Sequence, residues 1–127
     1  MPRRFDHIDL RVRDMMLARP FYETLLPALG FTRDAKIPGW LQYEAVDPAD
    51  AGFFGVVESP SHVANENRIA FWVASVEEVD RLAEVVRKAG AIHIEGPAEE
   101  APGYYAVFFE DPSGNRFEIC HRSDARH

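Results

Sequence analysis

Cysteine is almost absent from this sequence: Cys120 is the single one among 127 residues, so the chain cannot close an internal disulfide. Basic residues are also scarce, with 14 Lys and Arg against 21 Asp and Glu and a formal net charge of −7. This balance argues against nucleic acid as a partner, because phosphate binding needs clustered positive charge. No apolar run approaches the roughly 20 residues that cross a bilayer, and no secretory signal precedes the first strand pattern. We therefore expect a cytoplasmic protein without a membrane partner.

Several reactive motifs are missing as well. The sequence has no Gly-rich phosphate loop, no Gly-x-Ser-x-Gly elbow and no Cys-x-x-Cys pair, so NTPase, serine hydrolase and dithiol functions lack support. What is present is an ordinary globular composition, 46% hydrophobic and 28% charged. A chain of this length and composition predicts one folded domain, residues 1–127.

The domain is built from a repeat of about 60 residues. The segment 7–12 is echoed by 68–73, and each is followed by an apolar helical pattern that ends at a glycine. Each copy predicts a strand, a helix and three more strands, giving modules of about 1–62 and 63–127. A ferredoxin-like unit also suits the length, but the paired closing strands favour this four-stranded module. The predicted strands are 5–13, 31–36, 40–46, 53–58, 68–74, 91–95, 104–110 and 115–121.

The helices carry distinct end signals. Ser75 and Glu78 form a capping box, and Gly90 occupies the position that follows a helix end. The first helix is less regular, because Pro20 removes a backbone donor and Pro27 favours termination. We expect a break near Pro20.

Alternation along the strands separates two faces. The apolar face of the first strand should lie under the helix, and the opposite face is where chemistry would sit. In the closing hairpin, a loop with an even number of residues would pair Glu118 with Phe109 or Val107. Such a pairing predicts an aromatic wall beside Glu118 that includes Tyr105. The predicted helix-side residues are Ile8, Leu10, Val12, Ile69, Phe71, Val73, Phe117 and Ile119, and the opposite face carries His7, Asp9, Arg11, Arg68, Ala70, Trp72, Arg116, Glu118 and Cys120.

The repeat interval relates His7 to Arg68 and Glu58 to Glu118. For Glu58 an alternative assignment is open, since Val56 could be the repeat partner and Glu58 a solvated residue beside a loop. His7 could likewise be a surface histidine. Trp72 and Tyr105 could be core residues instead of cavity walls.

Taken together, several segments resemble the vicinal oxygen chelate superfamily, which includes glyoxalase I, fosfomycin-resistance enzymes, bleomycin-binding proteins and extradiol dioxygenases. The similarity covers nearly the whole chain, and its most specific part is the closing Asp-Pro-x-Gly-Asn-x-x-Glu-Ile segment at 111–119. It implies an α+β fold in which two tandem βαβββ modules form an open, cavity-bearing barrel, commonly in a homodimer. The segments that carry the resemblance are 7–12, 21–22, 29–31, 69–73 and 108–119.

The resemblance also implies a divalent metal, Zn, Ni, Mn, Fe or Co, with ligands at His7, Glu58, position 68 and Glu118. This sequence departs from the family at position 68, where Arg68 replaces the usual histidine and has no lone pair to offer. His7, Glu58 and Glu118 would still suffice for an open catalytic site. Alternatively, Arg68 forms a salt bridge with Glu58 or Glu118, and the cavity binds an organic ligand without a metal.

By this resemblance we expect a glyoxalase-like lyase or isomerase acting on a small oxygen-rich substrate. Glu118, or Glu58, would transfer the proton, and Arg11 and Arg68 would bind an anionic group of the substrate. Trp72 and Tyr105 would line the substrate cavity. The alternative is a metal-free sequestration protein similar to the bleomycin-resistance proteins, and a dioxygenase is a weaker third hypothesis.

Overall fold

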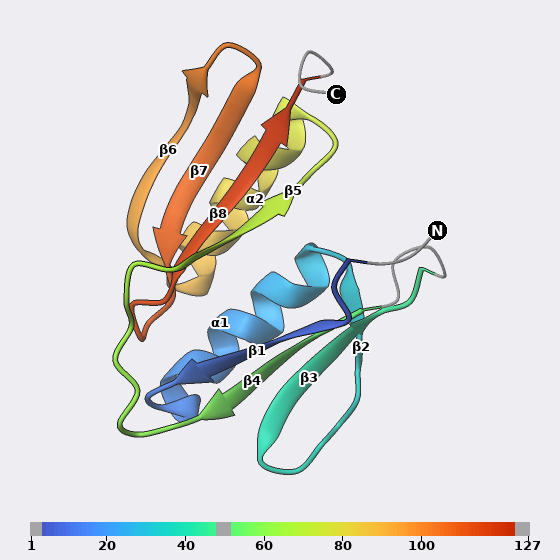
Figure 1. Ribbon diagram of the computed structural model, residues 1–127, viewed down its shortest axis with the longest axis vertical. Coiled ribbons are helices and arrows are strands. Elements are labelled where there is room, and N and C mark those ends of the chain that lie inside the picture. Colours follow the sequence, from blue (N-terminus) through green and yellow to red (C-terminus); the bar gives the residue numbers. More distant parts are fainter. Residues whose placement is uncertain (1–3, 48–51, 124–127) are drawn as a thin grey trace. The chain divides into compact units, whose positions relative to one another are not determined.

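The computed structural model describes residues 4–47 and 52–123 of the chain. Its contacts divide the chain into two compact units, Met1–Val63 and Ala64–His127. Each unit has one helix that packs on one face of a four-stranded sheet (Figure 1). The opposite face of each sheet, which we call the open face, is free of helices of the same unit.

Both units have the same order of elements. The first contains β1 (His7–Val12), α1 (Met15–Ala28), β2 (Phe31–Asp34), β3 (Trp40–Ala45) and β4 (Phe53–Glu58), with strand order β1-β4-β3-β2. The second contains β5 (Arg68–Trp72), α2 (Val76–Ala89), β6 (Ile92–Ala101), β7 (Tyr104–Glu110) and β8 (Arg116–Arg122), with order β5-β8-β7-β6. In each sheet the first strand runs parallel to the last, and the other neighbours are antiparallel.

The predicted α+β class with two tandem βαβββ modules is confirmed. Neither sheet is closed by itself. One detail differs from expectation: β6 is longer than the predicted 91–95, because it continues along β7 to Ala101 through several register shifts. Each shift bends the strand locally and increases its twist.

Helix α2 begins and ends where its sequence signals placed it. The Ser75 hydroxyl accepts a hydrogen bond from the Glu78 amide, 3.1 Å away, which satisfies one of the free donors of the first turn. Gly90 follows the helix with a φ of 103°, a left-handed conformation that costs glycine little. The apolar stripe is buried at Val79, Leu82, Ala83 and Val86.

The predicted break in the first helix is wrong, since α1 runs continuously from Met15 to Ala28 through both prolines. Pro20 is exposed and its carbonyl still accepts a hydrogen bond from the Thr24 hydroxyl. Each proline costs one backbone hydrogen bond, and the apolar stripe that the helix buries outweighs this cost. That stripe comprises Met15, Ala18, Phe21, Tyr22, Leu25 and Leu26.

Alternation predicted the faces of β1 and β5 correctly. Val12 is fully buried, whereas His7, Asp9 and Arg11 are exposed on the open face. In the second unit the helix-side core includes Phe117 and Ile119, both with no exposed surface.

Asp111 sets the register of the closing hairpin. Its Oδ1 accepts hydrogen bonds from the Ser113 and Asn115 amides at 2.8 and 2.9 Å, and its Oδ2 accepts one from the Asn115 side chain at 2.9 Å. Gly114, with a φ of 89°, closes the turn by donating to the Asp111 carbonyl. The loop therefore has an odd number of residues between the backbone partners Asp111 and Asn115.

This odd loop overturns the predicted pairing. Glu118 lies opposite Phe108, not opposite Phe109 or Val107. Phe108 thus shares the open face with Glu118, and Val107 and Phe109 face the helix, where both are buried. A shift by one residue exchanges the two faces of a strand, so one loop residue decides which aromatic side chains border the open face.

No helix in the described part of the chain is long and apolar enough to cross a membrane.

Replacing Asp111 with alanine should lower the free energy of unfolding by about 3 kcal/mol, because two backbone amides lose their buried acceptor. Urea unfolding followed by circular dichroism measures this change. Asp111→Asn is the matched control, since its amide oxygen can still accept from both backbone donors and should retain most of the stability. An alanine variant as stable as the wild type would show that the carboxylate does not hold the loop.

Candidate functional site

The open face of the second sheet carries two cross-strand rows of polar and aromatic side chains. One row runs Arg68, Arg116, Glu110 across β5, β8 and β7. The next runs Ala70, Glu118, Phe108, Glu95 across all four strands. Direct pairing brings the neighbours of a row within side-chain contact distance.

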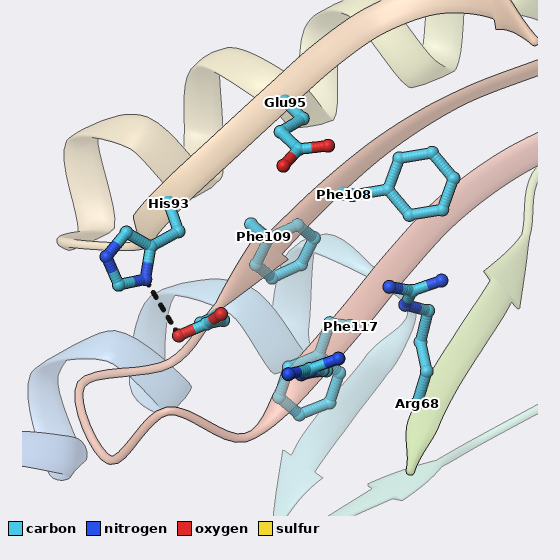
Figure 2. Close-up of a pocket in the computed structure, with 8 residues that line it drawn as sticks. Arg68, His93, Glu95, Phe108, Phe109 and Phe117 are labelled. Atoms are coloured by element: carbon cyan, nitrogen blue, oxygen red, sulfur yellow. Dashed lines mark hydrogen bonds and ion pairs between the residues drawn. The ribbon is translucent and has the colours of Figure 1, made fainter. Parts of the chain in front are cut away.

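A pocket of about 210 Å³ lies where β5 and β8 begin and β7 ends. It combines two arginines and two glutamates with an aromatic floor, and the side chains converge from β5, β6, β7 and β8 (Figure 2). The whole pocket belongs to the second unit. Its lining is Arg68, His93, Glu95, Phe108, Phe109, Glu110, Arg116 and Phe117.

Arg68 and Arg116 are direct partners on the parallel strands β5 and β8. Like charges placed opposite one another in a sheet repel, which destabilises the pair unless an anion lies between or beside them. Within residues 4–47 and 52–123 neither guanidinium forms an ion pair. Arg68 lies instead over the Phe108 ring, 4.8 Å from its centroid. The salt bridge considered for Arg68, with Glu58 or Glu118, is therefore absent from the described residues.

The two pocket glutamates differ in their engagement. Glu110 Oε1 lies 2.9 Å from His93 Nδ1, so this carboxylate already has a hydrogen-bond partner (Figure 2). Glu95, opposite Phe108 in the register, has no such partner among the described residues. His93 itself has a φ of 52°, uncommon outside glycine, and it sits where the β6–β7 register shifts.

Glu118 is 6% exposed and accepts a hydrogen bond from the Tyr104 hydroxyl. The Tyr104 ring reaches it from the far end of β7, and the Arg122 guanidinium lies 3.7 Å from the centroid of that ring. Burial, together with the bond to Glu118, raises the pKa of Tyr104 to about 12. The phenol is therefore neutral at physiological pH and donates a hydrogen bond to Glu118.

Two predicted cavity residues lie apart from the pocket. The Tyr105 hydroxyl donates to Asp80 of α2 at 2.6 Å, which corrects its expected place beside Glu118 and puts it on the helix side. Trp72 does lie on the open face, where it pairs with Cys120 and is 59% exposed. Neither residue lines the pocket.

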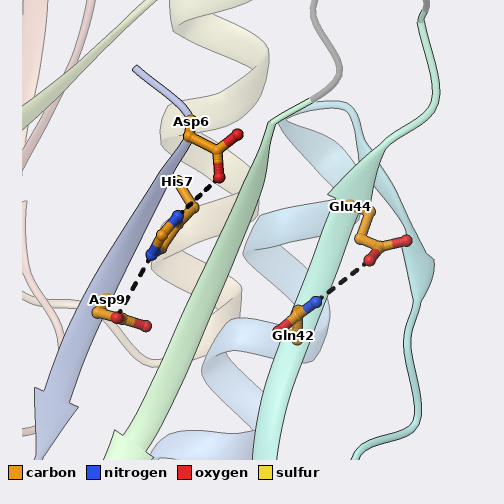
Figure 3. A network of polar contacts seen from close by, with 5 residues as sticks. All are labelled: Asp6, His7, Asp9, Gln42 and Glu44. Atoms are coloured by element: carbon orange, nitrogen blue, oxygen red, sulfur yellow. Dashed lines mark hydrogen bonds and ion pairs between the residues drawn. The ribbon is translucent and has the colours of Figure 1, made fainter.

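In the first unit, His7 sits between two carboxylates on the open face (Figure 3). Its Nδ1 is 2.9 Å from Asp6 Oδ2 and its Nε2 is 3.5 Å from Asp9 Oδ2. The imidazole also stacks on Phe53, with 4.3 Å between the ring centroids. The hydrogen bond to Asp6 raises the pKa of His7 above its usual 6.5. Desolvation opposes this increase, and the negative charge of Asp9 adds to it.

Glu58 does not lie beside His7. It pairs with Val12 at the end of β4, whereas His7 pairs with Phe53 at its beginning. Alternation also puts Glu58 on the helix side of the sheet, opposite to His7. The position that corresponds to Glu118 in the register is Gly55, which pairs with Asp9 as Glu118 pairs with Ala70. A Cβ at Gly55 would lie 3.1 Å from Asp9 Oδ1, so the aspartate occupies the space of a longer side chain there.

The residues predicted as metal ligands do not form a metal site in the described structure. His7 and Glu58 lie on opposite faces and cannot contact one ion, Arg68 has no lone pair, and Glu118 is engaged by a tyrosine. Among the described residues there is also no group of three or more His, Cys, Asp and Glu side chains suited to a metal. Arg11 lies on the open face of the first sheet, where it pairs with Val57.

The pocket adds residues for which the sequence predicted no role. For Arg116 the available signal is alternation, which places it on the face of Glu118; its pairing with Arg68 comes from the structure. Phe108 has no such signal, because an even hairpin loop would put it on the helix side. His93 and Glu95 reach the pocket through the register shifts of β6, which have no clear mark in the sequence. Glu110 reaches it because β7 pairs it with Arg116.

The model of the Glyoxalase/Bleomycin resistance protein/Dioxygenase superfamily matches residues 4–119. No curated protein sequence matches the chain. A glyoxalase/bleomycin resistance protein from Albidiferax ferrireducens T118 is similar in structure, with a TM-score of 0.77 and 25% identity over 94% of this chain and 98% of that one.

Two other solved structures share the fold. A putative glyoxalase from Bacillus halodurans has a TM-score of 0.76 at 24% identity, covering 93% of this chain and 95% of its own. The fosfomycin resistance protein FosX from Mesorhizobium loti has a TM-score of 0.72 at 19% identity, covering 99% and 98%.

Replacing Asp6 with asparagine should lower the pKa of His7 toward 6.5, because the charged partner of the imidazolium is removed. A raised pKa in the folded state means that His7 stabilises the fold fully below pH 6.5 and loses this contribution as the pH rises through the folded-state value. An NMR pH titration of the His7 ring signals measures this pKa in the wild type and in Asp6→Asn. Asp34→Asn, on the far edge strand β2, is the control and should leave the titration unchanged; an equal shift in both variants would contradict the assignment to Asp6.

Proposed function

We propose that this chain, which belongs to the glyoxalase/bleomycin resistance protein/dioxygenase superfamily, binds a small organic anion in the pocket of its second module. The observation that carries the proposal is the direct pairing of Arg68 with Arg116 on the open face, with no carboxylate bound to either among the described residues. Two neighbouring guanidinium groups can donate hydrogen bonds to the oxygens of a carboxylate or phosphonate. An anion would relieve their mutual repulsion.

The aromatic residues give the pocket an apolar side. Phe108 lies beneath the Arg68 guanidinium and supplies the ring surface on the open face. Phe109 and Phe117 also border the pocket, but their rings are buried on the helix side, with centroids 5.6 Å apart. An anion with a flat apolar body would therefore meet charge at one end and a ring surface along its side. The volume of about 210 Å³ suits a ligand the size of a substituted benzene ring.

This proposal adopts the metal-free binding protein that the sequence left as an alternative. In that form Arg68 takes the place of a ligand histidine and supplies positive charge at a position where other members of the family would hold a cation. Arg68 keeps the role of anion binding expected for it, and Arg116 joins it. The open face then needs no ion to attract an oxygen-rich ligand.

The metal-dependent lyase or isomerase stays a prediction, as does the role of Glu118 in proton transfer. The homodimer stays a prediction as well. Strands β1 and β5 are outer strands of their sheets in the described chain, so each has an edge that can pair with another strand. Sedimentation of the purified protein measures the oligomeric state directly.

Calorimetric titration with 4-methylbenzoate at low salt tests anion binding. We expect Arg68→Gln and Arg116→Gln each to weaken binding by about tenfold, the effect of losing one charge-assisted hydrogen bond. The neutral amide 4-methylbenzamide should bind more weakly than the acid. Arg33→Gln is the control, because Arg33 lies in the first unit in an ion pair with Glu44. Equal binding of acid and amide, or an equal loss in the control, would refute the proposal.

Metal analysis of the wild type and His7→Ala separates the two functions. The proposed function predicts that added Zn²⁺ or Ni²⁺ leaves the Tm unchanged in both proteins, because His7 and Glu58 lie on opposite faces of the first sheet and Arg68 cannot ligate a metal. A stoichiometric metal, or a rise in Tm that disappears in His7→Ala, would instead favour the metal-dependent lyase or isomerase.

A further inference from the structure

We infer that the ligand of the pocket is zwitterionic, with an ammonium group bound by Glu95 at the opposite end from the anionic group on Arg68 and Arg116. This inference rests on the proposed function and adds the chemical class of the ligand. It starts from the charge balance of the pocket. Two arginines face two glutamates, so the lining carries no net charge when His93 is neutral. A purely anionic ligand would meet the arginines and also the repulsion of an unpaired carboxylate.

The two carboxylates are not equivalent. Glu110 is held by His93 at 2.9 Å and is 24% exposed, so its charge is already engaged. Glu95 forms no ion pair or hydrogen bond among the described residues, although it lines the same pocket. Figure 2 shows Glu95 and Arg68 extending from different strands with their charged ends toward the pocket. The pocket thus presents unpaired charges of both signs.

The separation of these charges constrains the ligand. Arg116 lies on β8 and Glu95 on β6, with β7 between them. Two strand spacings separate the backbones by about 10 Å, which favours a ligand that carries its two charged groups at opposite ends. A flat molecule with an acid at one end and an amine at the other can reach both sides while its body lies on Phe108, which is the direct partner of Glu95.

A matched pair of probes tests the inference. The compounds 4-(aminomethyl)benzoate and 4-methylbenzoate share the ring and the carboxylate, and only the first carries an ammonium group. We expect the wild type to bind the amino compound about tenfold more tightly, the gain from one charge-assisted hydrogen bond. Glu95→Gln should remove this preference and leave the affinity for 4-methylbenzoate equal or higher. Glu99→Gln, on the same strand but outside the pocket, should keep it.

The outcomes separate the two proposals. Equal affinity of the wild type for both probes, or a preference that survives Glu95→Gln, overturns the zwitterionic ligand and leaves anion binding in place. If the wild type binds neither probe, the proposed anion binding fails, and the inference fails with it. Because Glu95 is exposed at the sheet edge, its substitution should leave the Tm unchanged, and a thermal melt verifies that the variant is folded.

Discussion

The hydrogen bonds around Asp111 are the constraint on which the rest of the site depends. They close the hairpin with an odd loop, which fixes β7 against β8 and decides that Phe108, not Phe109, shares a face with Glu118. That register also sets Arg116 beside Glu110 and leaves room for Tyr104 to reach Glu118 from the far end of the strand. A loop one residue shorter or longer would move Phe108 from the open face to the helix side.

The two modules share a fold and differ in the chemistry of equivalent positions. The first strand of each begins with a cation former on the open face, His7 in one and Arg68 in the other. His7 is held between two carboxylates, which favours its protonated form. Arg68 faces another arginine and an aromatic ring. The first open face is thus balanced internally, and the second presents charge that a ligand can use.

Much of the fold followed from the sequence because it depends on local patterns. Alternation gave the faces of β1 and β5, and the capping box with Gly90 gave the ends of α2. The break predicted at Pro20 is wrong, because burial of the apolar stripe of α1 outweighs the backbone hydrogen bond that the proline loses. The site was harder: the repeat interval matched Glu58 to Glu118, but pairing is set by turns, and the register puts Gly55 there. Glu95 reaches the pocket only through shifts in β6, which sequence periodicity does not record.

Anion binding depends on the guanidinium pair of the second sheet. The most direct test is an NMR titration that follows the arginine Nε–H signals while 4-methylbenzoate is added. We expect saturable shifts of the Arg68 and Arg116 signals, with Arg33 and Arg81 unchanged in their ion pairs with Glu44 and Glu78. Shifts of all four signals in proportion to ionic strength, or none at Arg68 and Arg116, would contradict anion binding at this pair.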